Sequence, residues 1–426
     1  MAFTRKSKII LATSLITVFL CVLILNLKSP GKRIEHVISS EGALDSPVVM
    51  KSIGELLGPP LIPGNKVTHL ENGDEIFSSM LSAIKSAKQT ITFETFIYWE
   101  GIIGENFSHA LSEKAKSGVK VHIILDWIGS RRMEQKSINE MIESGVQVKY
   151  YHQLRWYNVT RINNRTHRKI LVIDGRIGFT GGVGIADEWS GNAQDKNHWR
   201  DSHFKIQGPV VNQMQAAFMD NWNKISEQVL DGDKYFPVIS KSGNSTAQVF
   251  KSSPEEGSGS VRLMYLYSIV HAKKSILIAN AYFVPDSYVI KLLIEAARRG
   301  VKIEVIVPGT KIDTAITRMA SMATWGELLE AGINIYQYQP TMYHCKYMIV
   351  DDLWVSVGST NMDNRSFRLN DEANLNIIDN KWAHEMVETF SKDRSLSEQM
   401  TLAEWNKRPL LSKLLEHLSF LFSSQM

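Results

Sequence analysis

Two segments of the 426-residue chain carry histidine, lysine and aspartate at the same spacing. They are His167–Asp174 (HRKILVID) and His344–Asp351 (HCKYMIVD), and both follow the pattern H-x-K-x-x-x-x-D. Imidazole can act as a nucleophile or as an acid and base near neutral pH. A lysine beside it supplies a positive charge for a phosphate oxygen. Two such segments facing each other would place a nucleophile, a proton donor and two cations around one phosphorus, so the pattern predicts phosphodiester chemistry.

The spacing fits a β-strand. The residues after each lysine are apolar, and side chains alternate across a strand, so each histidine shares a face with the lysine two positions on. Cys345 then points to the other face, as a small buried residue. We expect the aspartates at the strand ends to turn back toward an imidazole. The candidate catalytic residues are His167, Lys169, Asp174, His344, Lys346 and Asp351.

The alternative is that the two segments are structural strands whose histidines are buried and hydrogen-bonded in the core. Lysine and aspartate recur with the histidine both times, which favours a site. No set of Cys, His and Asp has the spacing of a zinc site. The predicted chemistry therefore involves neither a metal nor a cofactor.

The surrounding sequence repeats as well. Three junctions recur in the same order: Ser86–Phe93 with His271–Ile278, Lys116–Leu125 with Arg298–Val307, and Glu143–Val146 with Glu330–Ile333. In each copy a helical pattern ends in glycine and a short β-rich run follows. Strands that alternate with helices indicate an α/β layered fold. The chain is therefore expected to hold two pseudo-symmetric α/β/α units that form one catalytic domain.

These patterns give expected boundaries along the chain. Residues 1–28 are a membrane anchor, 29–70 a linker, 71–235 the first unit, 236–400 the second unit and 401–426 an amphipathic tail. The linker assignment rests on its Gly, Pro and Ser content and its lack of periodicity. Regular structure is expected to begin near Asn72.

The amino-terminal stretch from Ile9 to Leu25 has no charged residue and is flanked by basic residues on both sides. It meets the lower bound for a bilayer-spanning helix, about 17 residues. A signal peptide is the alternative, but it has a shorter apolar core and a small-x-small cleavage site, which this stretch lacks. We expect a single-pass anchor in the cell membrane. Basic residues on both sides leave its orientation open.

Composition narrows the function classes only slightly. Hydrophobic residues make up 44% of the chain and charged residues 22%, as in ordinary globular proteins. The net charge of +4 suits an anionic partner without specifying one. The two cysteines, Cys21 and Cys345, do not suggest a disulfide framework.

A glycine-containing segment follows each motif. Six residues separate Asp351 from Gly358–Asn361 (GSTN), and six residues separate Asp174 from Gly181–Gly184 (GGVG). Glycine permits close approach of the backbone, and serine and asparagine can hydrogen-bond an imidazole or a phosphate. In the first copy Gly182 replaces the serine and Gly184 replaces the asparagine, so the two halves are not equivalent.

Together these motifs resemble the phospholipase D superfamily, from about Glu71 to the carboxyl end. Four further runs are similar to bacterial cardiolipin synthases: Gly178–Gly182, Trp199–Asp201, Tyr282–Asp286 and Asn364–Asn370. The resemblance implies two phospholipase D-like units. It also implies a two-step exchange, in which one histidine attacks the phosphorus of a phosphatidyl group and forms a phosphohistidine. The other histidine protonates the departing alcohol, and a second lipid alcohol accepts the phosphatidyl group.

By analogy with the superfamily, His167 is the nucleophile and His344 the acid and base. Glu372 matches a family carboxylate that orients the histidine, and Asn361 matches its polar neighbour; both are predicted substrate-site residues. The first half lacks the asparagine at Gly184, and either Asp201 or His203 could supply the missing contact.

Two further segments have open interpretations. Between Tyr151 and His167 the first copy has about ten more residues than the second, including Arg155, Trp156, Arg161 and the run Asn163–Arg165. This basic segment could receive lipid headgroups or be a solvated loop. The carboxyl-terminal stretch Leu410–Phe422 has helical apolar spacing and could lie on a bilayer or pack on the domain.

The expected function is transfer of a phosphatidyl group between phospholipids, with phosphatidylglycerol as the expected substrate. A phospholipase D that uses water is the first alternative, because it needs the same residues. A nuclease is a second, although the chain lacks a long Lys/Arg stripe and no nucleic-acid partner is expected. A non-catalytic membrane scaffold is a third. The sequence does not fix the oligomeric state.

Overall fold

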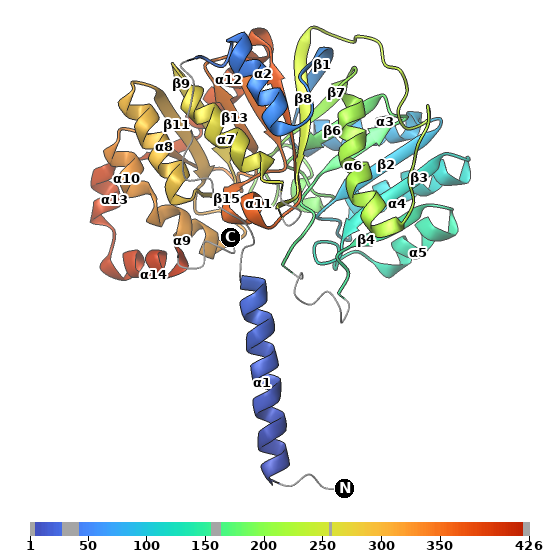
Figure 1. The fold of residues 1–426 in the computed structure, drawn as a ribbon, viewed down its shortest axis with the longest axis horizontal. Helices are drawn as coiled ribbons and strands as arrows, with labels where there is room; N and C mark the ends of the chain where they lie inside the picture. The colour runs from blue at the N-terminus through green and yellow to red at the C-terminus, as the bar shows by residue number, and fades with distance from the viewer. Residues whose placement is uncertain (1–4, 28–41, 155–162, 255–257, 421–426) are drawn as a thin grey trace.

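One continuous sheet runs through both halves of the protein. The computed structural model describes residues 5–27, 42–154, 163–254 and 258–420 (Figure 1). Its main sheet has 15 strands in the order β17-β12-β11-β9-β13-β14-β16-β8-β1-β7-β6-β5-β2-β3-β4. The order of the first half, read outward from β1, is the order of the second half read outward from β8, except that β17 extends the second half by one strand. The predicted duplication of an α/β unit is confirmed.

The strands of the first half are β1 (Ile62–Glu71), β2 (Thr90–Thr95), β3 (Lys120–Asp126), β4 (Gln147–Tyr151), β5 (Ile170–Ile173), β6 (Ile177–Gly181) and β7 (Ser202–Gln207). Those of the second half are β8 (Ser245–Ser252), β9 (Ser275–Asn280), β11 (Lys302–Pro308), β12 (Asn334–Tyr338), β13 (Lys346–Val350), β14 (Trp354–Gly358), β16 (Glu372–Ile378) and β17 (Ser397–Met400). A separate parallel pair joins β10 (Phe283–Val284) to β15 (Met362–Asp363). The halves meet where β1 pairs antiparallel with β8.

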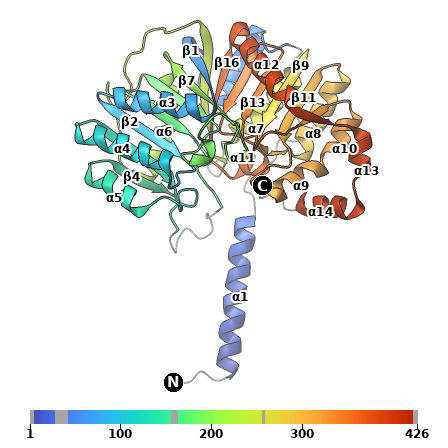
Figure 2. The same cartoon turned by 180° about the vertical axis from the view of Figure 1, so that it is seen from behind.

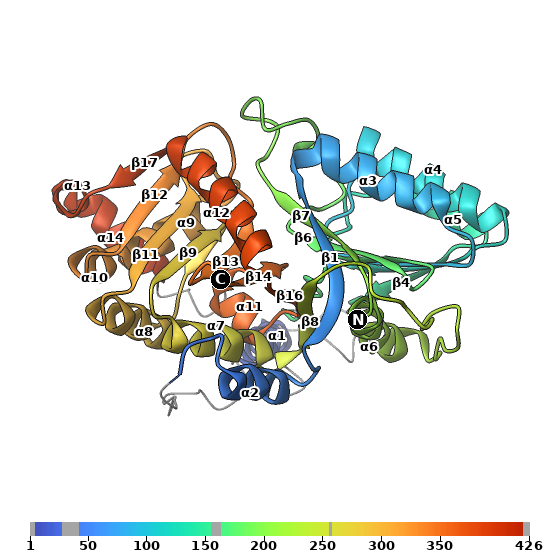
Figure 3. The ribbon, with the colours of Figure 1, turned by 90° about the horizontal axis from the view of Figure 1, so that it is seen from above.

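Helices cover both faces of this sheet, as Figure 3 shows from above. The first half carries α3 (Asn72–Ser86), α4 (Ile102–Lys116), α5 (Gln135–Glu143), a 3₁₀ turn at Asp187–Trp189 and α6 (Val211–Ser226). The second half carries α7 (Ser260–His271), α8 (Ser287–Arg298), α9 (Ala315–Ala323), α10 (Trp325–Glu330), α11 (Asn364–Arg368), α12 (Asn380–Ser395), α13 (Leu402–Lys407) and α14 (Leu410–Phe420). The helices α1 (Arg5–Leu27) and α2 (Pro47–Leu57) precede both halves.

Three apolar cores lie between these layers. One packs α3, α4 and α5 on the first half and another packs α7, α8 and α10 on the second. The third lies under α6 and α12 and joins residues of both halves, including Ile170, Val249, Tyr347 and Leu375. Cys345 is buried in this shared core, as predicted from strand alternation. Because this core crosses the β1–β8 pair, the halves form one folded body.

The glycines predicted to end helices do so with left-handed backbone. Gly118 and Gly300 follow α4 and α8 at φ 94° and 91°, and Gly145 and Gly332 occupy the next such position in each half at 96° and 82°. A Cβ atom disfavours this conformation, so glycine is preferred there. The recurrence of all four supports the matched junctions seen in the sequence.

The predicted start of regular structure near Asn72 is wrong. Helix α2 and all of strand β1 except Glu71 lie within residues 42–70, which were expected to be linker. Ser46 accepts a hydrogen bond from the Val49 amide, and Pro47 occupies the first turn of α2, both ordinary signals for a helix start. Gly58, which was interpreted as linker punctuation, caps the end of α2, and Pro63 and Gly64 lie where the register between β1 and β8 is irregular.

The apolar stretch from Ile9 to Leu25 lies within α1, which extends away from the body in Figures 1 and 2. Over the residues that the structure describes, none of the helices combines the length and apolarity that crossing a bilayer requires.

The expectation that Asp174 and Asp351 turn toward an imidazole is also wrong. Each residue starts the turn after its motif strand, at φ 51° and 55°. The Asp174 carboxylate accepts hydrogen bonds from the Lys88, Gln89 and Thr90 amides at 2.7–2.9 Å. Asp351 does the same for residues 273–275, at 2.7–3.0 Å. Each motif strand separates its aspartate from its histidine, so the carboxylate lies at the far end of the strand. The two aspartates therefore hold the segments that lead into β2 and β9.

This geometry predicts a stability role for Asp351. Replacing it by alanine removes three hydrogen bonds to backbone amides, so Asp351→Ala should lower the free energy of unfolding by about 1–3 kcal/mol. Asp352→Ala is the matched control, because Asp352 is exposed and has nearly the same backbone, at φ 53°. Urea unfolding of both variants measures the difference, and equal losses would contradict the assignment.

Candidate functional site

The two histidines are brought together by backbone bonds that cross between the halves. The His167 amide donates to the Asp371 carbonyl oxygen at 2.8 Å, and the His344 amide donates to the Arg200 carbonyl oxygen at 2.8 Å. Each histidine thus sits just before its own motif strand and is held by the segment that leads into β16 or β7 of the opposite half. Both side chains are largely buried where the halves meet.

A carboxylate from the opposite half binds each imidazole. His167 Nδ1 lies 3.0 and 3.1 Å from the two oxygens of Glu372, the first residue of β16. His344 Nδ1 lies 2.7 Å from Asp201 Oδ2, just before β7. An Nδ1–H donated to a carboxylate leaves Nε2 as the ring nitrogen that can react. Glu372 therefore orients the histidine of the first half, and Asp201 contacts His344 of the second; His203 contributes neither contact.

Hydrogen bonds keep both carboxylates ionised. Burial alone would raise the pKa of Glu372, but His167 and the hydroxyl of Ser359 outweigh it and lower that pKa. A second hydroxyl, Ser366 Oγ, donates to Glu372 at 2.7 Å. The pKa of Asp201 is lowered in the same way, because His344 offsets its burial. Both partners are thus anions that can stabilise an imidazolium.

The glycine that replaces serine in the first half has a physical reason. A Cβ atom on Gly182 would lie 2.1 Å from Asp201 Oδ1, so any larger residue would displace the carboxylate. Trp189 Nε1 donates a hydrogen bond to Asp201 at 2.8 Å, and in the second half Ser359 Oγ donates the corresponding hydrogen bond to Glu372. The inequality seen in the sequence therefore reflects two different ways of holding an equivalent carboxylate.

The two lysines lie beside their histidines, as the spacing predicted. Lys169 Nζ donates to the His167 carbonyl oxygen at 3.1 Å, and Lys346 Nζ donates to the His344 carbonyl oxygen at 2.8 Å. Lys346 Nζ also lies 3.1 Å from both ring nitrogens of His344. Burial, with the charge of Lys346, lowers the pKa of Lys169 to about 7. The two lysines are thus close enough for their charges to interact.

Both histidines are neutral in the resting site. Burial lowers the pKa of His167 to about 4, although Glu372 acts to raise it. Burial and Lys346 lower the pKa of His344. Within the described residues, no hydrogen bond reaches Nε2 of His167, whereas Lys346 lies beside Nε2 of His344. A free lone pair on His167 suits a nucleophile, and an imidazole with a lowered pKa suits an acid once protonated.

Aromatic rings enclose both imidazoles, and the sequence analysis did not assign them. The Phe96 ring centroid lies 5.3 Å from that of His167. The rings of Trp189, Trp199 and Tyr282 lie 5.2, 5.5 and 6.3 Å from His344. Trp199 and Tyr282 belong to runs already noted for their family resemblance, which was the available signal. Phe96 follows β2 and Trp189 ends the 3₁₀ turn, and only the fold brings these two segments to the site.

Other predicted residues lie near the site in different roles. Asn361 is buried, and its Oδ1 has no hydrogen-bond partner, so it can accept a bond from a substrate. Arg155, Trp156 and Arg161 lie outside the described residues. Arg165, from the same basic segment, is buried 3.5 Å from Asp126, so this arginine is part of the core and does not form a headgroup-binding surface.

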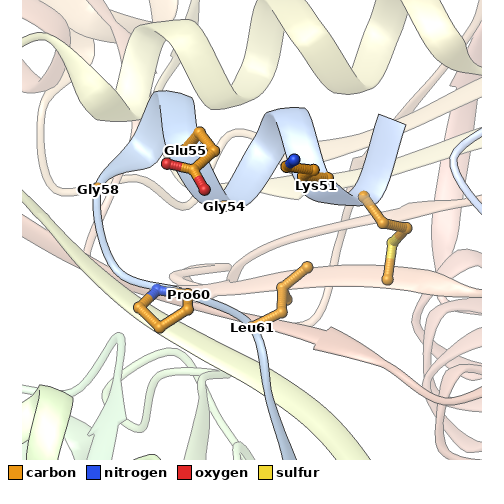
Figure 4. Close-up of a pocket in the computed structure, with 7 residues that line it drawn as sticks. Lys51, Gly54, Glu55, Gly58, Pro60 and Leu61 are labelled. Atoms are coloured by element: carbon orange, nitrogen blue, oxygen red, sulfur yellow. The ribbon is translucent and has the colours of Figure 1, made fainter. Parts of the chain in front are cut away.

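No group of three potential metal ligands occurs among the residues that the structure describes. A separate hollow lies beside α2, lined by Met50, Lys51, Glu55, Leu61 and neighbouring residues (Figure 4). It lies at the end of the body away from α11, whose Ser366 contacts Glu372. It contains no histidine.

Comparison with known proteins agrees with this geometry. The family profile described as cardiolipin synthase, PLD-like domain, matches residues 80–222 and 265–394. The chain belongs to this family. The two matched stretches contain both motif segments and both carboxylates that orient the histidines, Asp201 and Glu372. It is therefore an enzyme of the phospholipase D superfamily, a phosphatidyltransferase.

Individual relatives are similar over most of the chain. Cardiolipin synthase 2 of Staphylococcus epidermidis is 35% identical over 367 residues, covering 85% of this chain and 75% of the relative. The major cardiolipin synthase ClsA of Bacillus subtilis is 36% identical over 363 residues, covering 84% and 75%. Both spans include more than the catalytic motifs alone.

Solved structures support the fold. A phosphatidylserine synthase of Haemophilus influenzae superimposes with a TM-score of 0.69 at 14% identity, covering 89% of this chain and all of that one. A polyphosphate kinase of Porphyromonas gingivalis gives a TM-score of 0.53 at 13% identity, covering 92% and 57%. At these identities the likeness concerns the fold.

The crossed carboxylates should matter for turnover. In Glu372→Gln and Asp201→Asn the amide cannot stabilise an imidazolium, and it can turn its NH₂ group toward the ring and select the wrong tautomer. We expect kcat for phospholipid turnover to fall about 10²- to 10⁴-fold in each variant, the usual contribution of general acid–base catalysis. Glu398→Gln, an exposed carboxylate on β17, is the control that should keep full activity. Near-wild-type kcat in both site variants, with circular dichroism unchanged, would contradict the assignment.

Proposed function

We propose that the chain is a cardiolipin synthase-type phosphatidyltransferase that works through a phosphohistidine. The observation that carries the proposal is the pair of histidines, each fixed by a carboxylate of the other half, with two lysines beside them. This arrangement offers a nucleophile, an acid and positive charge to one phosphate. The curated relatives named cardiolipin synthases support the same substrate class.

In the first step His167 Nε2 attacks the phosphorus of a phosphatidyl group. The P–N bond forms while the bond from phosphorus to the headgroup oxygen breaks, and His344 gives its proton to that oxygen. The anionic phosphate of the lipid favours the protonated form of His344, whose pKa is lowered in the resting site. Lys169 and Lys346 stabilise the charge that develops on the equatorial oxygens.

In the second step an alcohol on another phospholipid attacks the phosphohistidine. His344 accepts the alcohol proton, a P–O bond forms and the P–N bond breaks, which regenerates both histidines. With phosphatidylglycerol as donor and acceptor, the products are cardiolipin and glycerol. Asn361 is proposed as a contact for a hydroxyl group of the lipid headgroup, because its buried Oδ1 has no partner in the protein and can accept a hydrogen bond.

Hydrolysis to phosphatidic acid is the alternative fate of the intermediate. The rings of Trp189, Trp199 and Tyr282 around His344 favour transfer, because apolar walls limit the access of water to the acid–base group. We further propose that the apolar stretch from Ile9 to Leu25, which carries no charge, anchors the enzyme at the cell membrane.

The product assay tests this function directly. Purified protein incubated with phosphatidylglycerol should yield cardiolipin and glycerol, and His167→Ala and His344→Ala should each lose most activity, since each histidine acts in every cycle. His109→Ala, on the surface of α4, is the matched control. Phosphatidic acid without cardiolipin would establish the hydrolase instead, and rapid cleavage of DNA would indicate a nuclease.

Trapping the intermediate tests the assignment of roles. A reaction with lipid labelled at the phosphorus, quenched within a turnover, should leave an acid-labile label on His167. A label mapped to His344 would reverse the two roles while leaving the proposed activity intact.

The pH profile follows from the pKa values of the site. His167 must be unprotonated to attack, and its pKa of about 4 makes kcat/KM rise as the pH increases through about 4. His344 must be protonated in the first step, and its pKa lies below the ordinary histidine value. Lys169 must also stay protonated, and its pKa is about 7. Loss of either proton makes kcat/KM fall as the pH increases, so the alkaline limb should have the steepness of two protons. In Lys169→Arg the guanidinium remains charged, so the alkaline limb of the residual activity should have the steepness of one proton, that of His344. An unchanged alkaline limb would assign it to another group.

A further inference from the structure

Helix α14 has its apolar side turned to solvent. Five leucines on it are exposed by 45–85%: Leu410, Leu411, Leu414, Leu415 and Leu418. The buried positions of the same helix are polar, Glu416 and Ser419. An amphipathic helix that covers a core has the opposite arrangement. The leucine surface, defined as these five residues, therefore has no partner within the part of the chain that the structure describes.

Polar contacts hold the helix in this orientation. Glu416 Oε2 lies 3.0 Å from Arg408 Nη1, and both side chains are nearly buried. The Arg408 guanidinium lies over the Trp405 ring, 4.2 Å from its centroid, and Trp405 Nε1 donates to the Met322 carbonyl oxygen of α9 at 3.0 Å. Because the ion pair fixes the inner side of α14, the leucines point outward as a property of the fold.

The leucine surface belongs to the edge of the body that holds the site. Helix α14 packs on α9, and the segment before α9 contains Asp313. Asp313 accepts a hydrogen bond from Tyr282 at 2.5 Å, and the Tyr282 ring lies 6.3 Å from that of His344. Figures 1 and 2 show α9, α11 and α14 on the side of the body from which α1 extends.

Exposed apolar side chains also occur at this edge on both sides of the site. Ile316, in the first turn of α9, is 43% exposed. In the first half, Ile128 and Leu154 follow the carboxyl ends of the parallel strands β3 and β4 and are 38% and 45% exposed. The carboxyl ends of parallel strands meet at one edge of a sheet, so these residues flank the histidines opposite the leucine surface.

The charge around the leucine surface selects one kind of partner. Lys407, Lys413 and His417 lie on or next to α14, and its one acidic side chain, Glu416, is paired with Arg408. Apolar residues bordered by basic ones bind anionic lipid surfaces, where leucine enters the acyl boundary and lysine meets the phosphates.

We propose that the leucine surface of α14 docks on an anionic phospholipid bilayer and holds the two-histidine site against it. The inference rests on the proposed function in that the substrates are bilayer lipids. Docking at this edge would let a headgroup reach the histidines without the lipid leaving the membrane. The surface is separate from the apolar stretch of α1, so it sets the orientation of the body rather than its presence at the membrane.

Fluorescence at one position tests the docking. The full chain carrying Cys21→Ser and Leu414→Cys, labelled with an environment-sensitive dye, is placed in nanodiscs containing phosphatidylglycerol. We expect a blue-shifted emission that is quenched by lipids with a spin label near the headgroup. The matched control carries the dye at His384→Cys, an exposed position of α12 that lies away from α14, and should show neither effect. Equal emission and quenching at the two positions would overturn the proposal, and so would a shift at 414 that depends on protein concentration alone, which indicates self-association.

Activity on two forms of one substrate separates docking from catalysis. Leu411→Glu with Leu414→Glu and Leu418→Glu should lower turnover of bilayer phosphatidylglycerol by about tenfold or more, since interfacial binding scales with apolar area. Turnover of a monomeric short-chain phosphatidylglycerol should not change. Val238→Glu, at a 91% exposed apolar residue near the β5–β6 turn, is the control. Equal losses on both substrates would contradict docking, whereas wild-type protein inactive on both would contradict the proposed function and leave the fluorescence test to decide docking.

Discussion

The structure depends on carboxylate–imidazole hydrogen bonds that cross between two copies of one unit. Glu372 of the second half holds His167 of the first, and Asp201 of the first holds His344 of the second. The backbone amide of each histidine also donates a hydrogen bond to the residue just before its carboxylate partner in the opposite half. The shared core under α6 and α12 and the antiparallel pairing of β1 with β8 keep these contacts in register. The site therefore exists only when both halves are folded against each other.

Burial gives this site its chemical character. Water is displaced by four aromatic rings and by the sheet itself, which lowers the pKa values of both histidines and of Lys169. The carboxylates remain ionised because hydroxyl groups, an indole and the imidazoles donate to them. The result is a neutral pair of imidazoles between fixed anions and closely spaced cations, ready for an anionic substrate.

Much of this could be predicted from sequence because it depends on periodicity. Strand alternation placed His167 with Lys169 and turned Cys345 into the core, and the glycines after the helices marked matched junctions. The partners of the histidines could not be assigned that way, since Glu372 and His167 lie 205 positions apart and only the packing of the halves joins them. For the same reason the roles of Asp174 and Asp351 could not be predicted: they are the last residues of the motifs, and they bind backbone amides at the far end of the strand.

The crossing of the partners also constrains how such a chain can evolve. A substitution at Asp201 removes the hydrogen-bond partner of His344, and Asp201 fits only because Gly182 has no side chain. Positions in different halves must therefore change together. Neither copy can acquire a separate function while the other keeps the original one, because the carboxylate that binds each histidine belongs to the other copy. Duplication here produced mutual dependence, and the two copies are inherited as a single functional unit.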